Sequence, residues 1–184
     1  QPPAFATVSG GVTFKEGGTN FTNSLLVGTS GTGTLSSADG NTGVGTAVLA
    51  ALTSGDNNTA VGLNALCANT TGLFNTGTGA FSLDANTTGG CNAGFGFNAI
   101  GGNTEGNLNT SIGANSMRCN TTGDNNVGLG ACALFNNTTA DNNTAVGFCS
   151  LKANTEGFSN VAVGNLSLEQ NTTGDKNVAV GSQA

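Results

Sequence analysis

The chain of 184 residues contains no tryptophan, tyrosine or histidine, only two prolines and one methionine. Without histidine, the most frequent general base and metal-binding side chain are both missing, and no other base stands beside a nucleophile. The five cysteines include no C-x-x-C pair, so the spacing typical of zinc sites is also absent. We therefore expect neither an enzyme nor a bound cofactor.

Charged residues are scarce, at 8% of the chain, with ten acidic and four basic side chains and a net charge of -6. Four basic residues do not make a stripe that tracks phosphates, so nucleic acid is not an expected partner. No apolar run of 18 residues occurs, which argues against membrane insertion. The first residues show no charged segment followed by an apolar one, so no signal peptide is predicted there.

Glycine is abundant, with 31 copies, and much of it belongs to a repeat of 17 residues. One glycine recurs at this spacing from Gly45 to Gly181, and an asparagine precedes it by four residues each time. A polar residue held in phase through every copy predicts an asparagine ladder along a stack of identical turns. The ladder consists of Asn41, Asn58, Asn75, Asn92, Asn109, Asn126, Asn143, Asn160 and Asn177.

Counted from this asparagine, positions 2 and 4 are mostly β-branched or apolar, whereas position 3 is only Gly, Ala or Ser. We expect a short strand with positions 2 and 4 on its core face and the small residues close to another wall. Position 9 supplies a second apolar column. The predicted core ladder consists of Val44, Val61, Val146, Val163, Val180, Leu49, Leu66, Leu83, Leu134, Leu151 and Leu168.

The repeat ends in Asn-Thr-Thr-Gly, as at 69–72 and 120–123, where Asn and Gly favour a sharp corner with left-handed backbone. Each turn is therefore predicted to hold a strand, a corner at position 5, a second short strand and a corner at positions 12 to 15. No helical periodicity is present. The predicted fold is an all-β parallel β-solenoid, a β-roll of about nine 17-residue turns.

The chain divides into three predicted parts. Residues 1–23 read as an N-terminal arm or cap, residues 24–40 as a degenerate capping turn, and residues 41–184 as the regular β-solenoid. The sequence reaches Ala184 in mid-repeat, and an open solenoid end presents unpaired strand edges to another subunit. We expect either end-to-end stacking into a filament or a segment of a longer protein.

The repeat at Asn58 to Gly72, NTAVGLNALCANTTG, and its variant at Asn143 to Gly157 resemble the head repeats of YadA-type trimeric autotransporter adhesins. Similar repeats occur in phage and viral fibre proteins. The resemblance covers about residues 41–184. It implies a left-handed β-roll with three chains side by side in a surface fibre.

The register of the repeat brings two of the five cysteines close together. Cys132 and Cys149 share position 7 on adjacent turns, about 4.8 Å apart, within reach of a disulfide, and free half-buried thiols are the alternative. An odd number of cysteines leaves at least one free, or bridging two chains.

Among many Asn-x-Ser/Thr motifs, those at one corner are glycosylation candidates in an exported protein: Asn69, Asn86, Asn120 and Asn171.

Two further columns suggest other functions. Position 16 carries Asp56, Asp124, Asp141 and Asp175, which are either solvated turn residues or, as a second interpretation, ligands for calcium or an acid and base pair. Position 13 is threonine from Thr53 to Thr172, a ladder that suits either ice binding or a hydrogen-bonded corner.

These observations predict a structural repeat protein, a self-associating subunit or segment of an extracellular, cell-surface or virion fibre or adhesin. The expected partners are further copies of the chain, as a lateral trimer or an end-to-end filament, and a host surface or matrix receptor. One alternative is an ice- or surface-binding β-solenoid that uses threonine ladders. A second is a carbohydrate-active β-helix.

Overall fold

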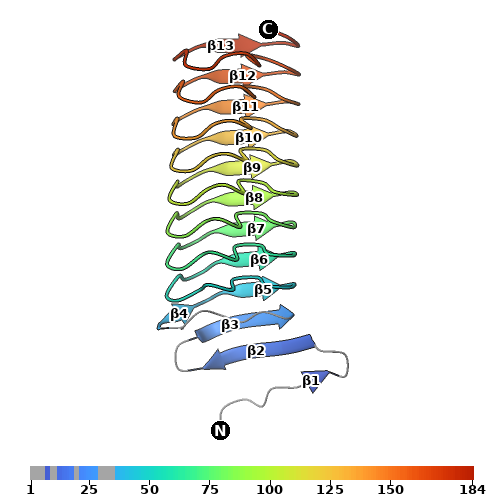
Figure 1. Cartoon of the computed structure of the whole chain (residues 1–184), viewed down its shortest axis with the longest axis vertical. Helices are drawn as coiled ribbons and strands as arrows, with labels where there is room; N and C mark the ends of the chain where they lie inside the picture. Colours follow the sequence, from blue (N-terminus) through green and yellow to red (C-terminus); the bar gives the residue numbers. More distant parts are fainter. Residues whose placement is uncertain (1–6, 9–11, 19–20, 29–35) are drawn as a thin grey trace.

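The computed structural model describes residues 7–8, 12–18, 21–28 and 36–184, and within them the chain forms one sheet and no helix (Figure 1). The strands follow one another as a stack in the order β1, β2, β3, β5 and on to β13, while β4 pairs with β3 outside this path. Their bounds are β1 Thr7–Val8, β2 Val12–Gly18, β3 Phe21–Gly28, β4 Ala38–Asp39, β5 Thr42–Val44, β6 Thr59–Val61, β7 Thr76–Thr78, β8 Ala93–Phe95, β9 Thr110–Ile112, β10 Val127–Leu129, β11 Thr144–Val146, β12 Val161–Val163 and β13 Val178–Val180.

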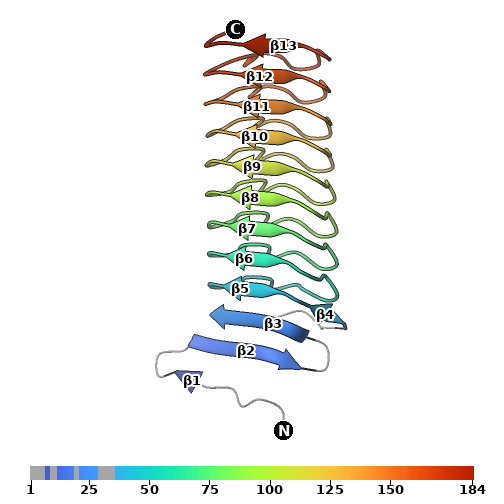
Figure 2. The same cartoon turned by 180° about the vertical axis from the view of Figure 1, so that it is seen from behind.

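From β5 onward each strand pairs in parallel with the strand one repeat later, in a register of 17 residues. Val127 of β10, for example, pairs with Thr144 of β11. The coils stack in the same order from β5 to β13 when the rod is seen from behind (Figure 2). The predicted all-β parallel β-solenoid of about nine 17-residue turns is confirmed.

Each regular turn holds a single strand of three residues, whereas two strands per turn were predicted. Positions 6 to 11 form turns, because the residues at positions 7 and 9 have left-handed backbone, as at Phe81 (φ 59) and Leu83 (φ 53). An extended strand does not accommodate such residues. The segment is nevertheless bonded to its neighbours, since Leu134 N–H donates to the Ser150 carbonyl at 3.0 Å.

The core differs from the prediction in its strand face. The position 9 column lies inside, where Leu49, Leu66, Leu83, Leu134 and Leu151 are fully buried and Leu168 packs against them. The valine column faces outward instead. Val44, Val61 and Val180 are 41%, 37% and 71% exposed, and Val146 and Val163 are only half-buried.

The narrow interior explains this inversion. Position 3 faces inward, toward positions 8 and 9 of the same coil, and leaves no room for a large side chain. A Cβ on Gly43 would lie 2.9 Å from the Val48 Cγ2 atom, closer than packed carbon atoms approach. The wall that was predicted beside position 3 is therefore the opposite side of the same turn.

The asparagine ladder is present along one buried corner. The Oδ1 atom of each ladder asparagine accepts the backbone N–H of the next, as from Asn109 to Asn92 at 3.0 Å. Its Nδ2 group donates to the carbonyl at position 15, as from Asn109 to Gly123 at 2.7 Å. Ser24 begins the ladder, because its hydroxyl accepts the Asn41 N–H at 2.8 Å.

A second asparagine ladder follows position 12 of the closing corner. Asn120 Nδ2 donates to the Asn103 Oδ1 atom at 2.8 Å and to the Gly123 carbonyl at 3.0 Å. Both ladders thus meet at the position 15 carbonyl. The left-handed residue near this corner is at position 17, for example Asn125 with φ 57, rather than at the asparagine that was predicted.

The N-terminal strands continue the same sheet. Strand β2 pairs antiparallel with β3, and β3 pairs in parallel with β5 through Leu26 and Gly43. Strand β3 crosses the predicted boundary at residue 24, since it begins at Phe21. Leu26 is the first core residue of the stack, with 2% of its surface exposed.

Candidate functional site

The outward face of strands β5 to β13 exposes apolar side chains along the rod, and we call it the sheet face. It consists of positions 2 and 4, and its largest exposed members are Val44, Val61, Phe95, Ile112, Val178 and Val180. Monomeric soluble proteins rarely expose contiguous apolar patches above a few hundred Å². A strip that crosses nine strands, roughly 38 Å at 4.8 Å per strand, is long for a free surface.

The sheet face carries no charge. Positions 1 to 9 of every regular turn lack Asp, Glu, Lys and Arg, and all charged residues of 41–184 stand at positions 10, 14, 16 and 17. The eight acidic and three basic side chains of residues 41–184 therefore lie away from strands β5 to β13. Charge is depleted in the same way at the centres of protein interfaces.

The position 16 carboxylates have a structural role. The Asp141 carboxylate accepts the Asp124 N–H at 2.7 Å, and the Asp124 carboxylate accepts the Asn107 N–H. Asp56 and Asp175 make the same bond to the preceding turn, so each aspartate links two coils. Among the described residues no three His, Cys, Asp or Glu side chains gather as metal ligands would.

The corner threonines at position 13 use their hydroxyl groups internally. The Thr121 hydroxyl donates to the Thr138 carbonyl at 3.0 Å, and the Thr70 hydroxyl donates to the Thr87 carbonyl at 3.0 Å. These hydroxyl protons are not available to an external surface. The position 13 threonines therefore form a hydrogen-bonded corner rather than an ice-binding ladder.

The predicted disulfide is not formed, because all five cysteines are free thiols in the structure. Cys132 and Cys149 lie on adjacent turns, as their spacing predicts. Burial, followed by the neighbouring Cys132 sulfur, raises the pKa of the Cys149 thiol. A thiol with a raised pKa yields little thiolate, the form that reacts to make a disulfide.

The four asparagines predicted as glycosylation sites lie along the closing corner of the repeat. Asn69, Asn86 and Asn120 are fully buried, and Asn171 is half-buried, because all four belong to the position 12 ladder. The Asn86 Nδ2 group donates to the Asn69 Oδ1 atom at 2.8 Å. An amide enclosed and bonded in this way is not accessible for transfer of a glycan.

Comparison with protein-family models, curated proteins and solved structures finds no match. The geometry of the chain alone therefore carries its functional interpretation. The described residues include no helix, and so no apolar helix long enough to cross a membrane.

The alternation along the strand did not by itself distinguish the sheet face from the core, because alternate residues share one side in either strand orientation. One available signal was the restriction of position 3 to small residues. Such a restriction occurs where a side chain meets the opposite wall of a narrow interior.

Proposed function

We propose that the chain is a structural segment of an extracellular or virion fibre or adhesin, and that its copies associate side by side through the sheet face. The observation that carries this proposal is the exposed, uncharged apolar strip on β5 to β13. Burial of such a strip is favourable by about 25 cal/mol for each Å² of apolar surface removed from water.

A second copy of the same chain is the occupant that suits this strip. Position 4 of the strip is Val, Phe, Ile or Leu in every regular turn except that of Thr78, so an identical strip meets it with mostly apolar residues against apolar residues. Because the charged positions lie elsewhere on each coil, like charges are not brought together at the centre of the contact. The proposal agrees with the side-by-side trimer that the resemblance to adhesin heads implies.

The rod itself suits a load-bearing role. Backbone hydrogen bonds of 2.8 to 3.0 Å join each coil to the next at several positions of the repeat, as at Asn126, Thr138 and Ser150. The two buried asparagine ladders add side-chain bonds along the same axis. Pulling two coils apart therefore breaks many bonds at once.

The test is the mass of the purified protein in solution, measured by sedimentation velocity and light scattering across a range of concentrations. We expect oligomers, with trimers the expected species. Ile112→Lys places a charge in the middle of the sheet face, where Ile112 is 48% exposed, and we expect this variant to be monomeric and folded.

Thr122→Lys is the matched control. Thr122 is exposed at position 14, on the closing corner, where Glu105 and Glu156 occur in other turns. We expect this variant to retain the mass of the parent. A parent protein that stays monomeric at every concentration, or an Ile112→Lys variant that assembles like the parent, would exclude the sheet face as the interface.

A second candidate function is binding to ice or another regular surface. It is favoured by threonines at position 2 of the sheet face, with Thr42, Thr59 and Thr76 on three successive strands. Unlike the corner threonines, these stand on the strands, about 4.8 Å apart along the rod. Thermal hysteresis by a monomeric parent protein, lost in Thr59→Lys, would support this candidate over the fibre.

A further inference from the structure

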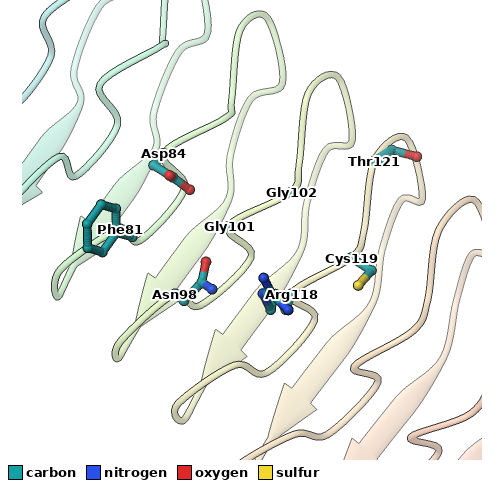
Figure 3. A pocket seen from close by; sticks show the side chains of 8 residues that line it. All are labelled: Phe81, Asp84, Asn98, Gly101, Gly102, Arg118, Cys119 and Thr121. Carbon is teal, nitrogen blue, oxygen red and sulfur yellow. The ribbon is translucent and has the colours of Figure 1, made fainter.

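A hollow of about 510 Å³ interrupts the side of the rod between turns at residues 81–84 and 118–121. It is lined by Phe81, Asp84, Asn98, Gly101, Gly102, Arg118, Cys119 and Thr121 (Figure 3). Its volume is within the range of small-molecule sites. It is separate from the sheet face, and the inference below is independent of self-association.

A local change in the repeat creates the hollow. Gly101 and Gly102 occupy positions 10 and 11, and this is the only regular turn with glycine at both. A Cβ at residue 101 would overlap the Asn98 amide oxygen, so this amide lies directly against Gly101 and lines the hollow. The column of position 10 side chains is thereby opened between Asp84 and Arg118.

Opposite charges stand on the two sides of this gap. Figure 3 shows Phe81 and Asp84 on one side of Gly101 and Gly102, with Cys119 and Thr121 on the other. Asp84 and Arg118 are two turns apart, about 9.6 Å along the rod. Burial raises the pKa of the Asp84 carboxyl, and Arg118 acts against that increase.

The Arg118 guanidinium is positioned by an aromatic ring, since its carbon lies 5.6 Å from the centre of the Phe135 ring. Among the described residues no carboxylate or carbonyl accepts a hydrogen bond from it. A planar guanidinium with free N–H groups is suited to a carboxylate, which it binds through two parallel hydrogen bonds.

The remaining lining groups suit a hydroxylated ring. The Asp84 carboxylate is an acceptor for hydroxyl groups, and the Asn98 amide offers both a donor and acceptors. The Phe81 ring, held edge-on by Phe97 at 6.0 Å, provides an apolar surface beside them. A free α-amino acid suits the hollow less well. Its ammonium and carboxylate groups are attached to the same carbon atom, so they cannot reach Asp84 and Arg118, which are two turns apart.

We propose that this hollow binds an acidic saccharide, a sugar unit whose carboxylate pairs with Arg118 and whose hydroxyl groups donate to Asp84. The sugar ring lies along the Gly101–Gly102 backbone, beside Phe81. Because the hollow is shallow and open to solvent, we expect a Kd of about a millimolar for a single unit.

The test is calorimetric titration of the full chain with a galacturonic acid trimer and, in parallel, with a neutral galactose trimer. We expect Arg118→Gln and Asp84→Asn each to weaken binding of the acidic trimer about tenfold or more. The neutral trimer should bind more weakly than the acidic one to the parent, and Arg118→Gln should abolish that difference.

Lys152→Gln is the matched control, because Lys152 also occupies position 10 but lies outside the hollow, and binding should be unchanged. A titration followed by the side-chain amide signal of Asn98 in the parent protein requires no variant, and we expect this signal to shift. No binding of the acidic trimer, binding unaffected by both variants, or equal affinity for the neutral trimer would each overturn the proposal.

Discussion

The backbone N–H of Asn126 donates a hydrogen bond of 3.0 Å to the side-chain oxygen of Asn109, one coil away. Both residues are fully buried. The bond is repeated at every coil from Asn58 to Asn177, so a side chain satisfies a buried backbone group that has no strand partner at that point. This relationship explains why the first position of the repeat never changes.

Asn109→Ala should lower the free energy of unfolding by about 2 to 3 kcal/mol, because the Asn126 N–H is left buried without an acceptor. Asn109→Asp should be at least as damaging, since a buried carboxylate then faces the Gly123 carbonyl. Urea unfolding followed by circular dichroism measures both. Asn136→Ala is the control. Position 11, where Asn136 stands, is naturally alanine in other turns, as at Ala85 and Ala153, so we expect a change within about 0.5 kcal/mol.

Gly113→Ala should destabilise the rod by about 1 to 3 kcal/mol from backbone strain alone, since Gly113 has φ 136. An added Cβ would also lie 2.6 Å from the Gly130 carbonyl carbon, and steric overlap increases the loss. Gly77→Ala is the matched substitution at position 3, where Ala60 and Ala145 occur naturally. Comparable urea midpoints for the two variants would contradict this account.

Ser159→Asn should increase the free energy of unfolding by about 1 kcal/mol. Ser159 has left-handed backbone with φ 56, and asparagine tolerates this conformation better than serine. Asn125 and Asn142 already occupy the equivalent position 17. Thr122 is exposed and does not have left-handed backbone, so Thr122→Asn should give no such gain. Thermal denaturation of both variants provides the comparison.

Asp84→Asn should stabilise the protein at pH 7 by an amount that disappears in acid. Burial raises the pKa of the folded Asp84 carboxyl, so the folded state binds protons more tightly than the unfolded state. The parent therefore gains stability as the pH falls from the folded pKa toward the unfolded value of about 3.9. Urea unfolding should show a smaller difference in the free energy of unfolding between Asp84→Asn and the parent at pH 3.5 than at pH 7. A difference that stays constant between these pH values would count against a raised pKa.

The repeat predicted most of the architecture. A 17-residue period without insertion requires identical coils, and the buried leucines at position 9 follow from a column that stays apolar, as from Leu49 to Leu151. The ladder from Asn41 onward was likewise predictable, because an invariant polar residue in a buried stack needs a repeated partner.

Other features depend on how the two sides of a coil meet in space. The alternation of Thr59, Ala60 and Val61 is the same whichever face points inward, and only the narrow gap to positions 8 and 9 decides that Ala60 is buried while Val61 is exposed. In the same way, Gly101 is one glycine among many in the sequence. Stacking places it between Asp84 and Arg118 on the side of the rod, because residues one repeat apart come to lie on adjacent coils. The sequence by itself determined the period and the stack, whereas the tertiary structure decided which side chains face solvent and where the rod is hollowed.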